Sequence, residues 1–456
     1  MNRIIKLFLP VFVYITMIDA ANAQYAVGKP RDASLKIGVA KIDITPDTPI
    51  WLSGYASREK PSKGIVQPIR SRVLIIQENP SSRIVFITAE VLGLSTEIID
   101  MVRKHAEQKY QLNRSQLFFN SSHTHTGPVI WPCLDVVYEF DAADQRRVSA
   151  YGQKLATRIC DALDSAMADL SAGLLFAGHG QAGFAINRRG LINPNGPTDH
   201  DVPVLRVTDL GGNTKAILFG YACHNTTIVD DYHYISGDYS GFAQTELERN
   251  NPGAVALFIT GCAGDQNPEP RGTLQLAVDH GKELAMAVQQ VLKGTLKPVR
   301  APIRTNYQEV ELKFRDVDIS RYQKDIVGDN IYLQRRAKLM LQAYNKGWGA
   351  GGYSYPIQAV RFGKDLTILG LSDEVVVDYS LNNKKKYAHE NLFVAGYCNQ
   401  VNCYIPNKRI LNEGGYEADD SMIYYGQPGR FEDDVEDRIM KKIGEVMKQV
   451  GALAGR

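Results

Sequence analysis

Two histidines separated by one residue are the strongest chemical signal in this sequence. His123 and His125 stand in the run SSHTHTGP at 121–128, where an apolar stretch ends and a glycine-proline turn begins. In an extended chain, residues two apart project from the same face, so both imidazoles can point into one cavity. Because imidazole is the commonest protein ligand for zinc, the pair indicates a metal site. Taken alone, it is also compatible with hydrogen-bonded interior histidines.

A third histidine and a carboxylate follow two other apolar stretches. His224 follows the run 216–222 after one cysteine, and Glu374 comes shortly after an apolar run that ends at Leu371. Active-site residues favour the ends of strands on a rigid scaffold, and a carboxylate can complete a zinc shell of imidazoles. On its own, His224 also fits a buried histidine, and Glu374 also fits a solvated turn.

Two loops carry polar groups that could contact a substrate or move a proton. The run NRRG contains Asn187 and Arg188, and a planar guanidinium can donate two hydrogen bonds to a carbonyl or carboxylate. The run GCAGDQNP contains Asp265 and Asn267 and follows an apolar stretch that ends at Thr260. A solvated basic turn is the alternative interpretation of NRRG. The chain has neither a P-loop nor a G-x-S-x-G nucleophile elbow.

A third segment, 396–418, is dense in tyrosine, asparagine and glycine and includes Tyr404 and Tyr416. Such a composition outside any periodic pattern is typical of a structured functional loop. Tyrosines that hydrogen-bond at the edge of a core are the alternative interpretation of this segment.

The elements predicted to position these groups alternate between short apolar strands and amphipathic helices. This pattern predicts an α/β (mixed α+β) body, with layered mixed β-sheets covered by helices, in one continuous unit whose strand order cannot be read. Strands are expected at 35–44, 72–76, 84–89, 116–121, 204–207, 216–223, 254–260, near 310 and at 360–369. Helices are expected at 96–110, 151–170, 240–250, 274–292 and from 431 to about 450.

The composition and the first residues bear on partners and location. With 52 Lys+Arg against 50 Asp+Glu, the net charge of +2 excludes an electrostatic nucleic-acid binder. Basic residues, an apolar run at 7–18 and an Ala-Asn-Ala site predict a signal peptide at 1–23, with an uncleaved anchor as the alternative. Residues 24–456 then form an exported catalytic domain, periplasmic or extracellular, without membrane insertion. The six cysteines form no CxxC pair and are expected to be buried free thiols. The sequence predicts no oligomeric state.

In their order along the chain, these motifs resemble the N-terminal catalytic region of the neutral/alkaline, non-lysosomal ceramidases. The resemblance implies one zinc ion and a set of substrate-polarising and proton-handling side chains. The matching segments are GVAKIDITP at 38–46, SHTHTGP at 122–128, NR at 187–188, ISGD at 235–238, GD at 264–265, YIP at 404–406 and YEA at 416–418. The implied zinc ligands are His123, His224, Glu374 and Tyr404. The implied accompanying groups are His125, Arg188 and Tyr416.

Two departures from the family pattern affect the expected chemistry. Asn267 stands where the ceramidases have a catalytic serine before proline. An amide is not a nucleophile, so hydrolysis would use zinc-activated water without a covalent acyl-enzyme. The sequence also ends shortly after Val450, and we expect it to lack the immunoglobulin-like C-terminal domain of full-length ceramidases. Both departures put ceramide, or any lipid, in doubt as the substrate.

The leading hypothesis is therefore an exported zinc-dependent hydrolase that cleaves an amide or ester bond in a small-molecule or oligosaccharide substrate. His125 or Asp265 would be the base, although Asp265 could equally orient a ligand histidine. Asn187 and Asn267 would contact the substrate. One alternative is a carbohydrate-active enzyme with the same metal site, either a glycosidase or a lyase acting on a uronate-containing glycan. Another is a non-catalytic zinc-retaining binding protein.

Overall fold

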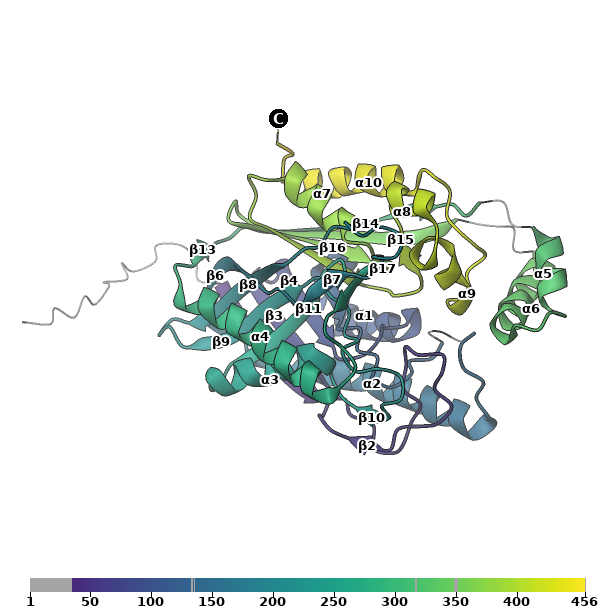
Figure 1. Cartoon of the computed structure of the whole chain (residues 1–456). Coiled ribbons are helices and arrows are strands. Elements are labelled where there is room, and N and C mark those ends of the chain that lie inside the picture. The colour runs from purple at the N-terminus through teal and green to yellow at the C-terminus, as the bar shows by residue number, and fades with distance from the viewer. Residues whose placement is uncertain (1–34, 133, 135, 316–317, 348–351, 456) are drawn as a thin grey trace, which may run out of the picture. The chain divides into compact units, whose positions relative to one another are not determined.

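The centre of the fold is a mixed sheet of thirteen strands (Figure 1). The computed structural model describes residues 35–132, 134, 136–315, 318–347 and 352–455, so the predicted signal peptide and Cys133 lie outside the described residues. The strand order is β11-β9-β8-β6-β1-β3-β4-β5-β18-β16-β15-β14, and β13 pairs with β6. These strands are β1 (Leu35–Asp43), β3 (Arg70–Asn79), β4 (Ser82–Ala89), β5 (Leu117–Ser121), β6 (Ser171–Gln181), β8 (Asp201–Asp209), β9 (Thr214–Tyr221), β11 (Val255–Thr260), β13 (Lys297–Val299), β14 (Ile303–Leu312), β15 (Tyr353–Phe362), β16 (Leu366–Ser372) and β18 (Leu392–Cys398).

Three short strand pairs hold loops beside this sheet. β2 (Gly64–Ile65) pairs with β10 (Tyr234–Ile235), and β7 (Ala185–Asn187) pairs with β12 (Gln266–Pro268). The third pair joins β17 (Glu374–Val375) to β19 (Tyr404–Ile405). The second and third pairs contain candidate site residues.

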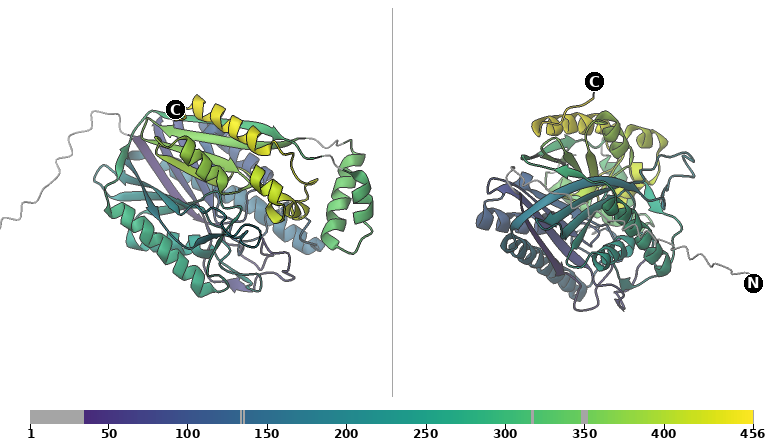
Figure 2. Two further views of the ribbon diagram at one scale, coloured as in Figure 1. Left: turned by 45° about the horizontal axis from the view of Figure 1, so that its top comes forward. Right: turned by 90° about the vertical axis from the view of Figure 1, so that its left-hand side faces the viewer.

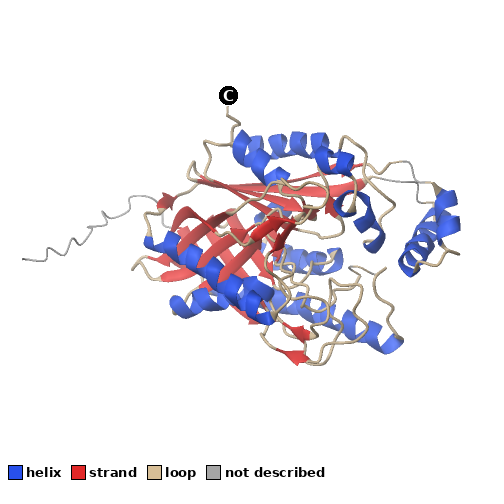
Figure 3. Cartoon of the chain, viewed as in Figure 1, coloured by secondary structure: helices blue, strands red, loops and turns tan. Residues whose placement is uncertain are grey.

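The sheet folds back on itself around a core made only of strands. This core joins Leu257 of β11 and Leu218 of β9 to Val360 of β15 and Ile368 of β16, although these strands stand toward opposite ends of the order. Three further apolar clusters lie between the outer faces of the sheet and the helices. The helices therefore cover the sheet from outside (Figures 2 and 3). This layering confirms the predicted α/β class.

The helices form where apolar residues recur at helical spacing behind a capping side chain. In α1, Ile98, Val102 and Ala106 are buried, and the Ser95 hydroxyl accepts a hydrogen bond from the backbone N–H of Ile98. The helices are α1 (Thr96–Tyr110), α2 (Ala142–Ala168), α3 (Asp238–Asn250), α4 (Leu274–Lys293), α5 (Ile319–Asp325), α6 (Ile331–Asn345), α7 (Asp378–Lys386), α8 (Lys408–Glu413), α9 (Ser421–Tyr424) and α10 (Val435–Gln449), with single turns at Arg114–Gln116 and Tyr416–Asp420.

The bounds of the predicted elements agree with the structure to within four residues, except at three places. The strand expected at 360–369 is two strands, because a turn at 363–365 separates β15 from β16 and Gly363 there has a φ of +51°. The helix expected from 151 begins at Ala142, where Asp141 caps it. Residues 396–398, expected in a loop, end the buried strand β18.

The described cysteines are free, and all but the half-buried Cys160 are buried. Within the described ranges, none of the helices is long and apolar enough to cross a membrane.

Candidate metal centre and substrate pocket

The C-terminal ends of four strands of the sheet lie in one region. β5 leads to His123, β9 to His224 and β16 to Glu374, while β18 leads to the segment that contains Tyr404. The buried side chain of Asn120 joins the end of β5 to the ends of β18 and β11: it donates to the Gly396 carbonyl at 2.7 Å and accepts from the Thr260 backbone N–H at 2.9 Å. Loops on a rigid scaffold are the usual place for functional side chains, and here the scaffold is fixed by hydrogen bonds at the strand ends.

His123 and His224 are held by backbone carbonyls in a single tautomer. The Nδ1–H of His123 donates to the Leu92 carbonyl at 2.7 Å, and that of His224 donates to the Ala263 carbonyl at 2.7 Å. A carbonyl only accepts, so the proton of each neutral ring is on Nδ1 and the lone pair is on Nε2. His123 also has a φ of +61°, an uncommon conformation for a residue with a side chain. A hydrogen bond from Nδ1–H to a carbonyl, as in both rings, is the arrangement in which histidines bind metals through Nε2.

A carboxylate and a phenol meet these ring nitrogens. The buried Glu374 places Oε2 at 2.9 Å from Nε2 of His224 and at 3.2 Å from Nε2 of His123. The Tyr404 hydroxyl lies 3.2 Å from Nε2 of His224. The structure thus brings together the four side chains that the sequence had suggested as zinc ligands.

The protonation states of this cluster favour a cation at its centre. Burial, with a smaller contribution from Arg188, lowers the pKa of His224 to about 4, so the ring is neutral at pH 7. Burial would raise the pKa of Glu374, but His123 and His224 outweigh it and hold that pKa well below its usual range. Nε2 of His224 and Oε2 of Glu374 lie 2.9 Å apart, a contact that a cation or a proton between them would stabilise. Two imidazole nitrogens, a carboxylate and a phenol are a donor set that fits zinc.

Glu374 is positioned by two tyrosines that the sequence analysis did not identify. The Tyr425 hydroxyl donates to Oε1 of Glu374, and the Tyr397 hydroxyl donates to Oε2 at 3.3 Å. Tyr397 belongs to the tyrosine-rich segment noted above, whereas nothing in the sequence around Tyr425 marks it. Both phenols fix the carboxylate so that Oε2 faces the histidines.

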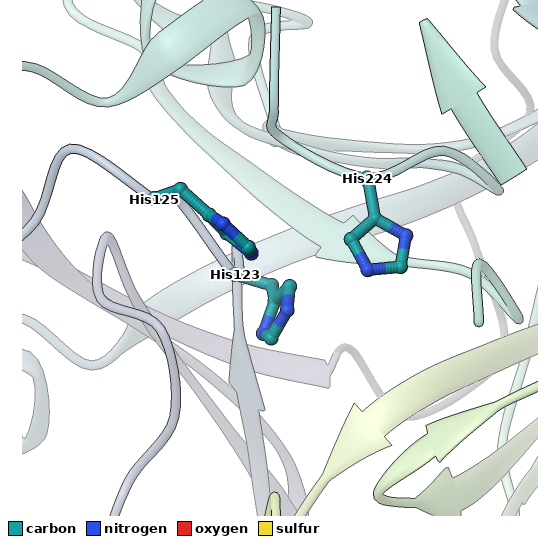
Figure 4. Close-up of side chains that lie close together, drawn as sticks. All are labelled: His123, His125 and His224. Atoms are coloured by element: carbon teal, nitrogen blue, oxygen red, sulfur yellow. The ribbon is translucent and has the colours of Figure 1, made fainter. Parts of the chain in front are cut away.

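His125 lies beside this cluster and has no hydrogen-bond partner within the described part of the chain. Both ring nitrogens are buried and unpaired, and the ring packs edge-on against Tyr55 with centroids 4.8 Å apart. Ligand atoms of His123, His125 and His224 all lie within 4.8 Å of one another (Figure 4). Burial and the other two histidines hold the pKa of His125 well below its ordinary value, so this ring is also neutral.

All members of the cluster except the fully buried His224 line an open cavity of about 230 Å³. Tyr416 lines this cavity, and the Arg188 guanidinium carbon lies 5.4 Å from the centre of the Tyr416 ring. Asn267 lines an adjoining hollow, and its Oδ1 is buried without a hydrogen bond to any residue that the structure describes. Both hollows contain Tyr55 and His125 in their walls.

Asn187 and Asp265 bond to the protein itself. Asn187 donates to the Pro197 carbonyl at 2.9 Å and to Oδ2 of Asp265 at 2.8 Å. Asp265 also accepts from the Val377 backbone N–H at 2.9 Å, and it lines neither hollow. These bonds hold the loop before Arg188 against the loop that contains Asn267.

A mixed α/β scaffold with a buried histidine-carboxylate cluster at the base of an open cavity is an architecture typical of metalloenzymes. The model of the neutral/alkaline non-lysosomal ceramidase N-terminal family matches residues 35–287, and the chain belongs to this family. It is 26% identical over 258 residues to the neutral ceramidase of Pseudomonas aeruginosa, covering 52% of this chain and 37% of that protein. It is 26% identical over 265 residues to the neutral ceramidase of Mycobacterium tuberculosis, covering 53% and 41%.

The fold extends beyond this matched region. The crystal structure of neutral ceramidase from Pseudomonas aeruginosa superposes with a TM-score of 0.72 at 18% identity, covering 93% of this chain and 76% of that one. The sequence matches, by contrast, span about two fifths of the curated relatives.

Proposed function

We propose that this protein is an exported zinc-dependent hydrolase that cleaves an amide or ester bond without a serine nucleophile. The observation that carries the proposal is the convergence of Nε2 of His224 and Nε2 of His123 on Oε2 of Glu374, at 2.9 and 3.2 Å, which a cation at their centre would stabilise. Family membership supports hydrolysis, since the relatives are ceramidases by name. Export is proposed from the pattern of residues 1–23.

His123, His224, Glu374 and Tyr404 would hold the zinc ion. When bound, zinc supplies a Lewis acid that polarises a carbonyl oxygen and activates water as a nucleophile. The carbonyl groups of Leu92 and Ala263 keep the ligand lone pairs directed at the centre. Tyr425 and Tyr397 hold the carboxylate in the same orientation.

His125 would accept and return the proton during hydrolysis. Its ring is neutral, its nitrogens have no hydrogen-bond partner in the part of the chain that the structure describes, and it lines the cavity beside the metal ligands. A neutral imidazole can take a proton from the attacking water and deliver it to the leaving amine or alcohol. Asp265 is proposed as a positioning residue, because its oxygens accept from Val377 and Asn187.

Tyr416 and Arg188 would stabilise negative charge on the substrate oxygen. Burial, followed by the charge of Glu374, raises the pKa of Tyr416, so its hydroxyl stays protonated and can donate a hydrogen bond. The Nε–H of Arg188 donates to Glu417 at 2.7 Å, while one of its terminal nitrogens is buried without a hydrogen-bond partner among the described residues. Donors directed at developing charge are a major source of catalysis in acyl transfer.

Asn267 would orient the substrate in the adjoining hollow. Its side chain is an amide, so it forms no acyl-enzyme, and its unpaired Oδ1 can accept a hydrogen bond from a substrate N–H or O–H. Asn187 is proposed to act through the loop that it fastens to Asp265, because its amide already donates to two protein oxygens.

The proposal is tested with purified protein, a chelator and a panel of acyl amides and esters. We expect the zinc-loaded protein to hydrolyse at least one member, the chelated protein to lose that activity, and added zinc to restore it. Unaltered activity after complete removal of metal would contradict zinc dependence. Unsaturated-product absorbance on uronate glycans, without hydrolysis of any amide or ester, would replace the hydrolase by a lyase.

A further inference from the structure

The hollow next to the metal cavity has its own chemistry. It has a volume of about 500 Å³ and shares Gly54, Tyr55, His125, Tyr404 and Tyr416 with the metal cavity. The walls that the two do not share contain three arginines, one glutamate and two apolar side chains: Arg188, Arg189, Arg271, Glu417, Leu191 and Ile192. A substrate reacting at the metal centre can therefore extend into this hollow.

The three arginines differ in how far protein carboxylates neutralise them. Arg189 is fully paired, because it donates to both Glu413 and Glu417. Arg188 also donates to Glu417, through its Nε–H, so Arg188 and Arg189 share this carboxylate. Within the described residues, Arg271 has no carboxylate oxygen within 4.0 Å, and its hydrogen bond is to the Tyr55 hydroxyl at 3.4 Å. The hollow thus has one uncompensated positive charge.

The ring of Tyr55 lies between Arg271 and His125, the proposed proton acceptor. The Arg271 guanidinium bonds to Tyr55, and Tyr55 packs against His125. Leu191 in the same hollow is fully exposed and Ile192 is 49% exposed, so both offer apolar surface that water covers in the free protein. The hollow therefore presents a cation close to the metal centre together with an apolar surface.

We infer, on the basis of the proposed hydrolase function, that the substrate is an N-acyl amino acid: an amide with a carboxylate near the scissile bond and an apolar acyl group. Arg271 is then the residue that determines specificity, because its planar fork can bind a carboxylate through two hydrogen bonds. A single uncompensated guanidinium matches the single charge of a carboxylate. Leu191 and Ile192 contact the acyl group. The reaction consumes one water, breaks the C–N bond and releases a carboxylic acid and a free amino acid.

The inference is tested with two amides that share one acyl group. N-hexanoylglycine has the carboxylate, and N-hexanoylethanolamine has a neutral hydroxyl in its place. The proteins are the wild type, Arg271→Gln, Arg271→Lys and a matched control, Arg249→Gln, which removes a surface arginine that is 69% exposed on α3. Two readouts are measured: kcat/KM of the zinc-loaded proteins and, by calorimetry, binding of each amide to the metal-stripped proteins.

We expect the wild type to prefer N-hexanoylglycine by about tenfold or more in both readouts, as a charge-assisted hydrogen bond predicts. Arg271→Gln loses this preference by weakening the glycine derivative alone, Arg271→Lys retains part of it, and Arg249→Gln leaves it unchanged. Equal use of the two amides by the wild type, or an undiminished preference in Arg271→Gln, overturns the inference.

The remaining outcomes separate this inference from the proposed function. If neither these amides nor any member of the amide and ester panel is hydrolysed, but the metal-stripped protein binds the glycine derivative selectively through Arg271, the hydrolase proposal fails and the carboxylate site stands. If amides are hydrolysed without such selectivity, the hydrolase proposal stands and the carboxylate site at Arg271 is refuted. Tighter binding of O-phosphorylated N-hexanoylethanolamine than of N-hexanoylglycine would overturn the assignment of a carboxylate.

Discussion

Glu374 and Tyr404 are direct register partners in the short parallel ladder between β17 and β19. The Glu374 backbone N–H donates to the Cys403 carbonyl at 3.0 Å, which fixes this register. Register partners in a parallel pair project their side chains to the same side, so the carboxylate and the phenol reach the histidines together. The spacing of half of the proposed ligand set is thus determined by backbone hydrogen bonds.

Removing a proposed ligand is expected to remove the metal. His123→Ala and Glu374→Ala should fall from about one zinc ion per chain to almost none, since a site with fewer protein ligands holds zinc weakly. The matched control is His105→Ala, because His105 is a half-buried histidine that pairs with Asp164 away from the cavity. Zinc is measured by elemental analysis after dialysis. Full zinc content in both variants would show that the ion, if bound, sits elsewhere.

Tyr425→Phe is expected to weaken zinc binding without removing it. The substitution deletes one hydrogen bond to Oε1 of Glu374, and loss of a partner behind a metal ligand typically costs about 10- to 100-fold in affinity. Tyr424→Phe is the control, because Tyr424 lines the same cavity without a hydrogen bond to Glu374. Affinities come from competition with a chromophoric chelator. Identical affinities for the two variants would contradict a positioning role for Tyr425.

Asn267→Ala is expected to reduce activity moderately and leave the reaction path unchanged. Losing one hydrogen bond to the substrate lowers kcat/KM by about tenfold. In the wild type, mass spectrometry of acid-quenched turnover mixtures should find no acyl group attached to the chain. A covalent acyl adduct would refute the serine-free path.

Asn120→Ala is expected to destabilise the fold, because it removes the side-chain acceptor of the buried Thr260 N–H and leaves the Gly396 carbonyl with the weak Cys398 thiol donor. The free energy of unfolding should fall by about 2–3 kcal/mol, measured by urea unfolding of the metal-stripped protein. Asn250→Ala, which removes an exposed asparagine on α3, should change it by less than about 0.5 kcal/mol. Equal urea midpoints for the two variants would show that Asn120 does not hold the strand ends together.

Much of the scaffold could be predicted because its elements have local signatures. The helix at 96–110 follows from the spacing of Ile98 and Val102, and β4 and β11 are short runs rich in apolar residues. Strand order could not be predicted, since the pairing of β5 with β18 joins segments far apart in sequence. β6 escaped notice because glycines interrupt its alternating pattern.

Some residues of the candidate site could also be predicted from the sequence, and others could not. His123, His224 and Glu374 could be found because each follows an apolar strand, where side chains tend to face a shared edge. Tyr425 could not, because it follows the short helix α9 and reaches Glu374 only through tertiary packing. Arg271 could not either: its significance is the lack of a nearby carboxylate, which only the folded chain displays.

The distance along the chain between the site's members affects how the protein matures. His224 and Glu374 are 150 residues apart, and His224 and Tyr404 are 180 apart. A nascent chain that has been synthesised only as far as α4 contains both histidines but neither the carboxylate nor the phenol. An ion bound by all four would act as a cross-link between early and late segments, so metal loading would report that the last strands have docked.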